Sequence, residues 1–315
     1  MAPKTIQPKV VVICGPTALG KTSAAIQLAE IYNAEIVGAD SMQIYKHMDI
    51  GTAKPTAEEQ TRIKHHMIDI IDPDDRFDAR QYAVMARETI EKLYHRNKIP
   101  FVVGGTGFYI KALANGLFNV EAAGDNIRNS LKDEAEIRGI AVLYDRLCRQ
   151  DPEAAKKIHP NDTYRIIRAL EVHAMTGKTL SGFHKAHGFK DRPFVVLKVG
   201  LHIRRETLYD RINKRVDVMI DNGFVDEVKG LLAMGYSPES KSMQSIGYRH
   251  IVDFIKGSRA WEETVRTLKR DTRRYAKRQL TWFRGDPEVI WKTPDALQDI
   301  KDLINKFLQK DNKSS

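Results

Sequence analysis

The sequence has very little cysteine, since Cys14 and Cys148 are its only cysteines in 315 residues. Two cysteines cannot build the disulfide framework of a small secreted protein or the four-ligand set of a structural zinc site. No hydrophobic run approaches the ~20 residues that cross a membrane. The start, MAPKTIQPK, lacks the apolar core of a secretory signal. We therefore expect a protein of the reducing cytoplasm, without a membrane partner.

Acidic residues are outnumbered, with 41 Asp and Glu against 51 Lys and Arg and a net charge of +10 at pH 7. A hydrophobic content of 42% is enough for one large domain or two modest ones. A basic surface suits a polyanionic partner, either nucleic acid or an acidic membrane surface. A basic enzyme without such a partner has the same composition, so charge alone leaves the partner open.

The first third of the chain alternates between apolar runs and helix-like stretches. In order, strands and helices are expected at 9–14, 22–31, 35–37, 79–96 and 99–107. This pattern is typical of a doubly wound α/β domain, whose ligands bind beyond the carboxyl ends of the strands. Segments 15–22, 38–43 and 104–107 each follow a strand, so we expect them to converge.

The stretch VVICGPTALGKTSAA, residues 11–25, contains the pattern G-x-x-x-x-G-K-[ST] between a strand and a helix. Its glycines allow a tight path in which backbone N–H groups point at phosphate oxygens, and the helix adds its positive end. Lys21 supplies a cation, and the Thr22 hydroxyl can ligate Mg²⁺. The predicted phosphate loop is Gly15, Pro16, Thr17, Ala18, Leu19, Gly20, Lys21 and Thr22.

The residue pattern changes in the middle of the chain. From about residue 118 the sequence is nearly all helix-forming, and a core-type strand resumes at 192–201. We expect a P-loop NTPase-like parallel sheet with flanking helices over 1–117 and 197–315, and a mostly helical insertion over 118–196. Later helices are expected at 204–222, 225–234 and 261–283.

Two strand ends carry further candidate groups. From the local residues alone, the Asp40 carboxylate has three roles open to it: metal ligand, general base or helix N-cap, of which a cap is the commonest for an Asp-Ser pair. The stretch Gly104 to Gly107 has no acidic residue where a hydrolytic NTPase is expected to place one. It offers close backbone approach and the Thr106 hydroxyl.

Basic residues recur along the expected helix 261–283. They are Arg266, Lys269, Arg270, Arg273, Arg274, Lys277, Arg278 and Arg284, with Asp271 as the local acid. Positions 266, 270, 273, 274 and 277 follow helical spacing and form one basic stripe. The natural partner of such a stripe is a phosphate backbone, and the alternative is an ordinary solvated helix face.

Six motifs together resemble a known family. They are GPTALGKT, DSMQIYKHMDIGTAKP, GGTGFYIKAL, RIIRALEVHAMTG, SIGYRH and RRYAKRQLTWFR, spread over about residues 10–284. In this order they resemble the successive motifs of bacterial tRNA dimethylallyltransferases. The resemblance implies transfer of the dimethylallyl group from dimethylallyl diphosphate to N6 of adenosine 37 in tRNA. The phosphate in the loop would then be the leaving group and not a fuel.

The resemblance also implies roles for single residues. Lys21, Arg215 and a Mg²⁺ ion held partly by Thr22 would stabilise the departing diphosphate. Asp40 would accept a hydrogen bond from the N6 amine and then take its proton as the C–N bond forms. Thr106 would position the prenyl donor and the nucleophile. The target base would be turned out of its loop to reach the site.

The same resemblance implies where tRNA is held, with the insertion gripping the anticodon loop. The implied contacts are Asp40, Ser41, Met42, Gln43, Arg128, Tyr164, Arg165, Ile166, Ile167, Arg168, Gln244, Ser245, Ile246, Gly247, Tyr248 and Arg249, to which the basic stripe adds Arg273, Arg274 and Lys277. We expect the chain to act as a monomer. Phe108 departs from the family pattern, where leucine is common.

Three other functions compete with this one. A small-molecule kinase shares the loop and the fold, but the missing acid at 104–107 argues against it. A prenyltransferase acting on free AMP or ADP needs no tRNA-gripping insertion, so segment 118–196 argues against it. A non-catalytic RNA-binding protein has no use for a phosphate loop together with Asp40 and Thr106.

Overall fold

The structure is a computed structural model that describes residues 7–117, 125–188 and 190–309. The chain divides into a core unit, Met1–Ala114 with Arg192–Ser315, and a helical unit, Asn115–Asp191. The insertion was expected to end at residue 196. The boundary falls earlier because strand β5 of the core unit already begins at Val195.

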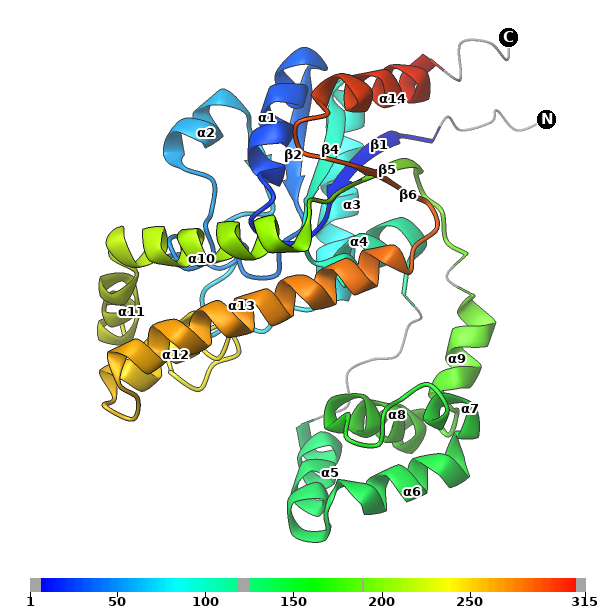
Figure 1. Cartoon of the computed structure of the whole chain (residues 1–315). Coiled ribbons are helices and arrows are strands. Elements are labelled where there is room, and N and C mark those ends of the chain that lie inside the picture. The colour runs from blue at the N-terminus through cyan, green and yellow to red at the C-terminus, as the bar shows by residue number, and fades with distance from the viewer. Residues whose placement is uncertain (1–6, 118–124, 189, 310–315) are drawn as a thin grey trace, which may run out of the picture. The chain divides into compact units, whose positions relative to one another are not determined.

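The core unit is built on a six-stranded sheet in the order β3-β2-β4-β1-β5-β6, with all neighbours parallel (Figure 1). The strands are β1 (Lys9–Cys14), β2 (Ala34–Gly38), β3 (His65–His66), β4 (Ile99–Gly104), β5 (Val195–Leu201) and β6 (Val289–Lys292). The expected α/β fold with a parallel sheet is confirmed. The two edge strands were not predicted, because β3 is only the pair His65–His66 and β6 has only four residues.

Helices follow the strands along the chain. Those of the core unit are α1 (Lys21–Ile31), α2 (Ala57–Arg62), α3 (Ala79–His95), α4 (Gly107–Asn115), α10 (Arg205–Asp221), α11 (Phe224–Ala233), α12 (Tyr248–Ile255), α13 (Trp261–Arg284) and α14 (Leu297–Gln309). The five predicted helices of this unit are confirmed to within about two residues, the usual uncertainty of helix ends. Helices α2, α4, α12 and α14 were not predicted.

The sheet is covered on both faces. Val11 and Ile13 of β1 belong to a buried cluster that includes side chains of α1, α10 and α14. Because successive side chains of a strand point to opposite faces, the buried Val10 and Val12 face the other side. Helix α3 contacts β2 and β4. Each fully buried aliphatic side chain contributes about 1.5–3 kcal/mol, so this core holds the strand ends firmly.

The carboxyl ends of the central strands meet at one edge of the sheet. Cys14, the last residue of β1, is level with Gly104 of β4 and with Gly200 of β5. A Cβ on Gly104 would lie 2.1 Å from the carbonyl oxygen of Ala39, which follows β2. The segments after β2 and β4 therefore touch, and only glycine allows this approach.

The helical unit has its own hydrophobic core. Its helices are α5 (Asp125–Arg138), α6 (Ile140–Gln150), α7 (Pro152–Ala155), α8 (Thr163–Thr176) and α9 (Leu180–His187). Leu147 and Leu170 are among the buried residues that join α6 to α8. Asp162 caps α8 by accepting the N–H of Arg165, and Gly177 ends the helix with a φ of 67°.

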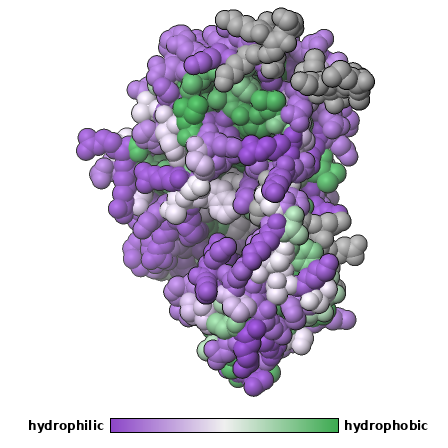
Figure 2. Space-filling view, turned by 90° about the vertical axis from the view of Figure 1, so that its right-hand side faces the viewer, coloured by the Kyte–Doolittle hydropathy of each residue, from purple (hydrophilic) through white to green (hydrophobic). Residues whose placement is uncertain are grey.

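Polar residues cover most of the face that Figure 2 shows. Hydrophobic residues gather in the upper part of this face. Among the helices that the structure describes, none has the length and apolar character needed to span a bilayer.

Candidate active site

A cavity of about 620 Å³ lies at the carboxyl edge of the sheet, within the core unit. Its walls come from the phosphate loop, segments 40–43 and 51–55, helix α10 and helix α13. Val103 and Gly104 at the end of β4 also line it. Of the segments that were expected to converge after three different strands, residues 17–22 and 40–43 line this cavity, and the segment 104–107 reaches it through Gly104.

The phosphate loop joins β1 to α1 with a backbone that needs its glycines. Gly15 has a φ of +137°, and a Cβ there would lie 2.7 Å from the carbonyl oxygen of Leu201. Gly20 has a φ of 74° and stands just before Lys21, the first residue of α1. The first turn of α1 contains no acidic residue. The positive end of the helix is therefore available to an anion in the cavity.

Lys21 is the cation of this loop. Its Nζ donates to the carbonyl oxygen of Pro16 at 2.7 Å. Burial, followed by the positive charge of Arg215, lowers the pKa of Lys21 to about 8, although Asp40 opposes both. A lysine with so low a pKa is charged at neutral pH but loses its proton readily above it.

Arg215 reaches the same cavity from α10. Ile212, Val216 and Met219 line the cavity from the same face of that helix. Burial lowers the pKa of Arg215 and Asp40 opposes the change, yet a guanidinium keeps its charge at any ordinary pH. The alternative of a solvent-exposed helix charge is wrong, because the residue is half-buried and lines the cavity.

Asp40 lies among these cations. Its carboxylate raises the pKa of Lys21, of Arg215 and of Tyr275. Its Oδ1 accepts the N–H of Met42 at 2.9 Å, and residues 41–44 form a turn. The alternative in which Asp40 caps a helix is therefore wrong, since its carboxylate caps a turn.

Thr106 ties the segment after β4 to the segment after β2. Its Oγ1 accepts the N–H of Ser41 at 3.0 Å, and its own N–H donates to the carbonyl of Ala39 at 3.1 Å. The Thr106 hydroxyl also lies 3.4 Å from the Ser41 hydroxyl. Thr106 thus helps to fix the backbone that carries Asp40.

Helix α13 contributes two groups that sequence reasoning missed. Gln279 is buried; its Oε1 accepts the N–H of Thr17 at 3.0 Å and its Nε2 donates to the carbonyl of Gly105 at 2.9 Å. The Tyr275 side chain hydrogen-bonds to Thr106 and Gln279, and burial raises its pKa to about 12. The available signal was their i, i+4 spacing, which puts two polar residues on one helix face.

Glu227 of α11 is a third residue that the sequence did not reveal. Its carboxylate accepts the backbone N–H groups of Asp49, Ile50 and Gly51 at 2.9, 2.6 and 3.0 Å. It also accepts the Tyr248 hydroxyl at 2.6 Å. These bonds anchor the segment that leads into 51–55, one wall of the cavity.

The segment 244–249, a predicted tRNA contact, splits into parts. Ser245, Ile246 and Gly247 line the cavity, and Gln244 is exposed. Tyr248 is buried with its hydroxyl on Glu227, so the prediction that its side chain contacts tRNA is contradicted.

The predicted tRNA contacts of the helical unit include both exposed and buried side chains. Tyr164 is 69% exposed, and the guanidinium carbon of Arg128 lies 5.3 Å from the centre of its ring. Ile166 and Ile167 are buried in the core of the unit, so side-chain contacts to tRNA are wrong for these two. Around them, Arg165 is exposed and pairs with Asp162, and Arg168 pairs with Glu171.

The basic stripe on α13 is partly neutralised. Lys269 pairs with Asp217 of α10 at 2.6 Å, and Nη1 of Arg273 donates to Oδ1 of Asn213 on the same helix at 2.6 Å. Asp271 is therefore not the only acid near the stripe, and Arg273 faces α10. Arg274 and Lys277 are exposed, as the stripe predicted.

Oxygen donors for a metal are present at the cavity. Among the described residues there is no group of three or more His, Cys, Asp or Glu side chains that could hold an ion by themselves. The Thr22 hydroxyl and the Asp40 carboxylate both line the cavity. Such a sparse oxygen set fits Mg²⁺, which usually takes one or two protein ligands together with phosphate oxygens and water.

Comparisons with known proteins agree on one family. The model of the family "IPP transferase" matches residues 43–286. The chain is 52% identical over 304 residues to a tRNA dimethylallyltransferase of Desulfosudis oleivorans, covering 96% of this chain and 97% of the relative. One from Geobacter sulfurreducens is 49% identical, with coverage of 95% and 96%.

Solved structures give the same result. The structure of the tRNA isopentenylpyrophosphate transferase from Bacillus halodurans matches with a TM-score of 0.74 and 39% identity, covering 98% of this chain and 99% of that one. A eukaryotic dimethylallyltransferase acting on tRNA matches with a TM-score of 0.76 and 32% identity, covering 91% and 74%.

Proposed function

Because the chain belongs to the IPP transferase family, we propose that it transfers the dimethylallyl group of dimethylallyl diphosphate to N6 of adenosine 37 in tRNA, releasing diphosphate. One observation carries the proposal: Asp40 lines the same cavity as the phosphate loop and Arg215. An anion-binding loop and a proton acceptor are the two groups that this substitution needs.

The leaving group is stabilised by positive charge. As the bond between the allylic carbon and the diphosphate oxygen breaks, negative charge grows on that oxygen. Lys21 and Arg215 line the cavity and would meet this charge together with N–H groups of the phosphate loop. Preorganised charge of this kind is usually the largest single contribution to catalysis.

The nucleophile is the exocyclic amine of adenosine. Its lone pair is delocalised into the ring, so it attacks weakly unless a base takes its proton as the new C–N bond forms. We propose that Asp40 takes this proton. The hydrogen bond from the N–H of Met42 to Asp40, and that from the N–H of Ser41 to Thr106, hold the segment 40–42 in place. A base in an unpaired anticodon loop is the least costly to turn out of its stack.

Thr22 would hold Mg²⁺, which supplies further positive charge to the diphosphate when bound. We propose that tRNA contacts the exposed residues of segments 40–43 and 244–249 and the pair Arg128 and Tyr164. It would also contact the exposed Arg274 and Lys277 of α13. We further propose that the chain works as a monomer in the cytoplasm.

The alternative acceptor is free AMP or ADP. The exposed Tyr164 beside the half-buried Arg128 in the helical unit favours a macromolecular acceptor, because unstacked RNA bases stack on aromatic rings and on guanidinium planes. A kinase is disfavoured because β4 ends in glycines and Thr106, with no acid.

The test is an acceptor assay with labelled dimethylallyl diphosphate and Mg²⁺. We expect label in unmodified tRNA, none in AMP, and none in a control tRNA with guanosine at position 37, which has no N6 amine. Label in AMP alone would contradict the proposal and favour the nucleotide prenyltransferase.

A further inference from the structure

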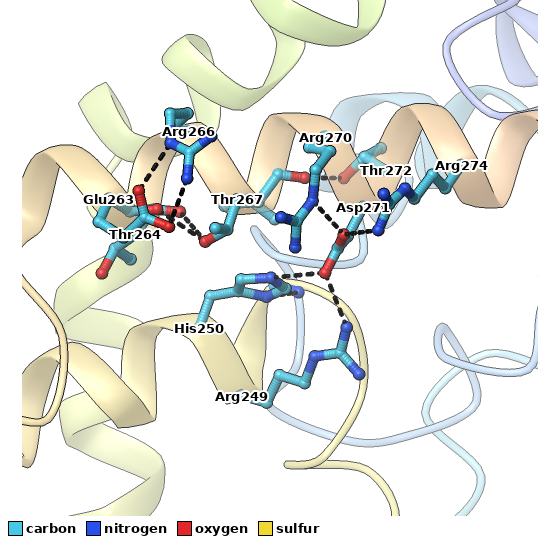
Figure 3. Close-up of polar contacts among 12 residues, drawn as sticks. Arg249, His250, Glu263, Thr264, Arg266, Thr267, Arg270, Asp271, Thr272 and Arg274 are labelled. Carbon is cyan, nitrogen blue, oxygen red and sulfur yellow. Dashed lines mark hydrogen bonds and ion pairs between the residues drawn. The ribbon is translucent and has the colours of Figure 1, made fainter.

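One acidic side chain of α13 is surrounded by nitrogen donors (Figure 3). Oδ2 of Asp271 accepts Nη2 of Arg249 at 3.0 Å and Nε2 of His250 at 3.2 Å. Oδ1 accepts Nε of Arg270 at 2.9 Å and lies 3.7 Å from Nη1 of Arg274. The Asp271 side chain is 14% exposed, whereas that of Arg274 is 64% exposed. The acid thus lies beneath the arginines it binds.

His250 connects this cluster to the cavity. It is buried, and burial lowers its pKa, which favours the neutral ring. The Nδ1 of this ring accepts the N–H of Gly247 at 3.4 Å, so the ring proton is assigned to Nε2 and donates to Asp271. Gly247 lines the cavity. The carboxylate therefore holds both the cavity wall at 245–247 and the arginines outside it.

The cluster keeps a positive surplus. Three guanidinium groups face one carboxylate and a neutral histidine, which leaves an excess of two positive charges. Burial alone would raise the pKa of Asp271, but Arg270 and His250 bring it to about 2, so the carboxylate stays charged. Each guanidinium has five N–H groups, and the bonds to Asp271 use only part of them.

We propose that Asp271 is a positioning residue for tRNA binding: it holds Arg249, Arg270 and Arg274 in the orientation in which their remaining N–H groups bind phosphates of the RNA backbone. The inference rests on the proposed function, which supplies the RNA partner. An arginine whose rotamers are already fixed loses less conformational freedom when it binds a phosphate.

This role and simple electrostatics predict opposite results. If only total charge mattered, replacing Asp271 by a neutral residue would add positive charge and tighten tRNA binding. If Asp271 positions the arginines, the same change weakens binding. Glu263 offers a matched control on the same helix, because its carboxylate hydrogen-bonds the exposed Arg266 at 2.6 and 2.7 Å.

The experiment measures the dissociation constant of unmodified tRNA against NaCl concentration for the wild type, Asp271→Asn and Glu263→Gln. We expect Asp271→Asn to bind roughly tenfold more weakly, the size of one charge-assisted hydrogen bond. Its slope of log K against log salt should be shallower by about 0.7–0.9 for each phosphate that the arginines no longer bind. Glu263→Gln should bind as tightly as the wild type or more tightly. The KM of Glu263→Gln for dimethylallyl diphosphate should equal that of the wild type.

Asp271→Glu covers the case in which Asp271→Asn fails to fold. It keeps the charge and moves the carboxylate outward by one methylene, so weaker tRNA binding by this variant comes from position alone. Asp271→Asn or Asp271→Glu binding tRNA as tightly as the wild type would overturn the inference and leave the proposed function intact. A wild-type chain that did not bind tRNA would remove both.

Discussion

Helix α13 has an inner face whose polar groups bond to the core unit and an outer face that carries exposed cations. The inner face carries Tyr275 and Gln279, whose polar atoms bond to the phosphate loop and to the segment after β4. The outer face carries Lys277 and Arg284, which are exposed. Among the described residues neither of these two forms an ion pair.

The contrast separates two kinds of contribution. Groups on the inner face act at fixed, short distances inside a cavity, so their loss should change the chemical step or the binding of the prenyl donor. Groups on the outer face act as charges near solvent, where salt screens them and each is worth little. Their loss should change only the binding of a polyanion.

The largest effect should come from Asp40 at the centre of the cavity. Asp40→Asn keeps the shape and leaves an amide oxygen for the N–H of Met42, but it removes the proton acceptor. We expect kcat to fall by about 10²–10⁴, the usual contribution of a general base, with tRNA affinity nearly unchanged. Single-turnover transfer and tRNA binding measure the two quantities. Asp210→Asn, at an exposed position of α10, controls for the lost charge. A normal rate for Asp40→Asn would remove Asp40 from the mechanism.

A smaller but clear effect is expected from Gln279→Met. The change keeps the volume and removes the hydrogen bonds to Thr17, Gly105 and Tyr275, which leaves the N–H of Thr17 and the carbonyl of Gly105 without their partner. An unsatisfied buried group costs about 1–3 kcal/mol. We therefore expect the KM for dimethylallyl diphosphate to rise roughly tenfold, with no change in the salt dependence of tRNA binding. Gln298→Met, at an exposed site on α14, serves as control. If Gln279→Met instead changed only the salt dependence of tRNA binding, the two faces of α13 would not have separate functions.

Local sequence was enough for the parts of the site that depend on neighbouring residues. The phosphate loop needs a fixed spacing within eight residues, and its strand and helix flank it directly. Asp40 and Thr106 follow strands, and parallel strands bring their carboxyl ends to one edge. These rules are sufficient to place both residues near the loop from the amino-acid order alone.

Gln279 and Glu227 could not be found in this way, because their partners are far away in the chain. Gln279 is 262 residues from Thr17 and 174 from Gly105, and Glu227 is 178 from Asp49. No periodicity links such positions. The errors at Ile166 and Ile167 have a different cause: a motif was treated as one surface, although successive residues of a helix point in different directions.

Charge on the outer face should have a modest effect that depends on salt. In Lys277→Gln with Arg284→Gln, two exposed charges are removed. The slope of log K for tRNA against log salt should become shallower by roughly 0.7–0.9 for each phosphate no longer bound, with kcat unchanged. Arg273→Gln is the control, since it loses one positive charge from a side chain that bonds Asn213, and the change of slope is compared per charge removed. An equal change of slope in Arg273→Gln would break the comparison between the faces.

The smallest effect concerns the proton on Lys21. Its pKa in the folded chain is about 8, below the ordinary lysine value of 10.5, so the lysine becomes neutral as the pH rises through about 8. Affinity for inorganic diphosphate should then fall. The folded state holds this proton less tightly than the unfolded chain, so the unfolded chain binds more protons between about pH 8 and 10.5. Over that window the free energy of unfolding should therefore rise with pH.

Lys21→Arg separates this titration from that of the ligand. An arginine stays charged over the whole range, while the diphosphate titrates identically with both proteins. Calorimetric titration with inorganic diphosphate from about pH 7 to about pH 9.5 should show a steeper loss of affinity for the wild type than for the variant. The same loss in both proteins would mean that Lys21 keeps its proton. The buried cation of the cavity would then be as independent of pH as the exposed charges on the outer face of α13, and burial would not distinguish the two.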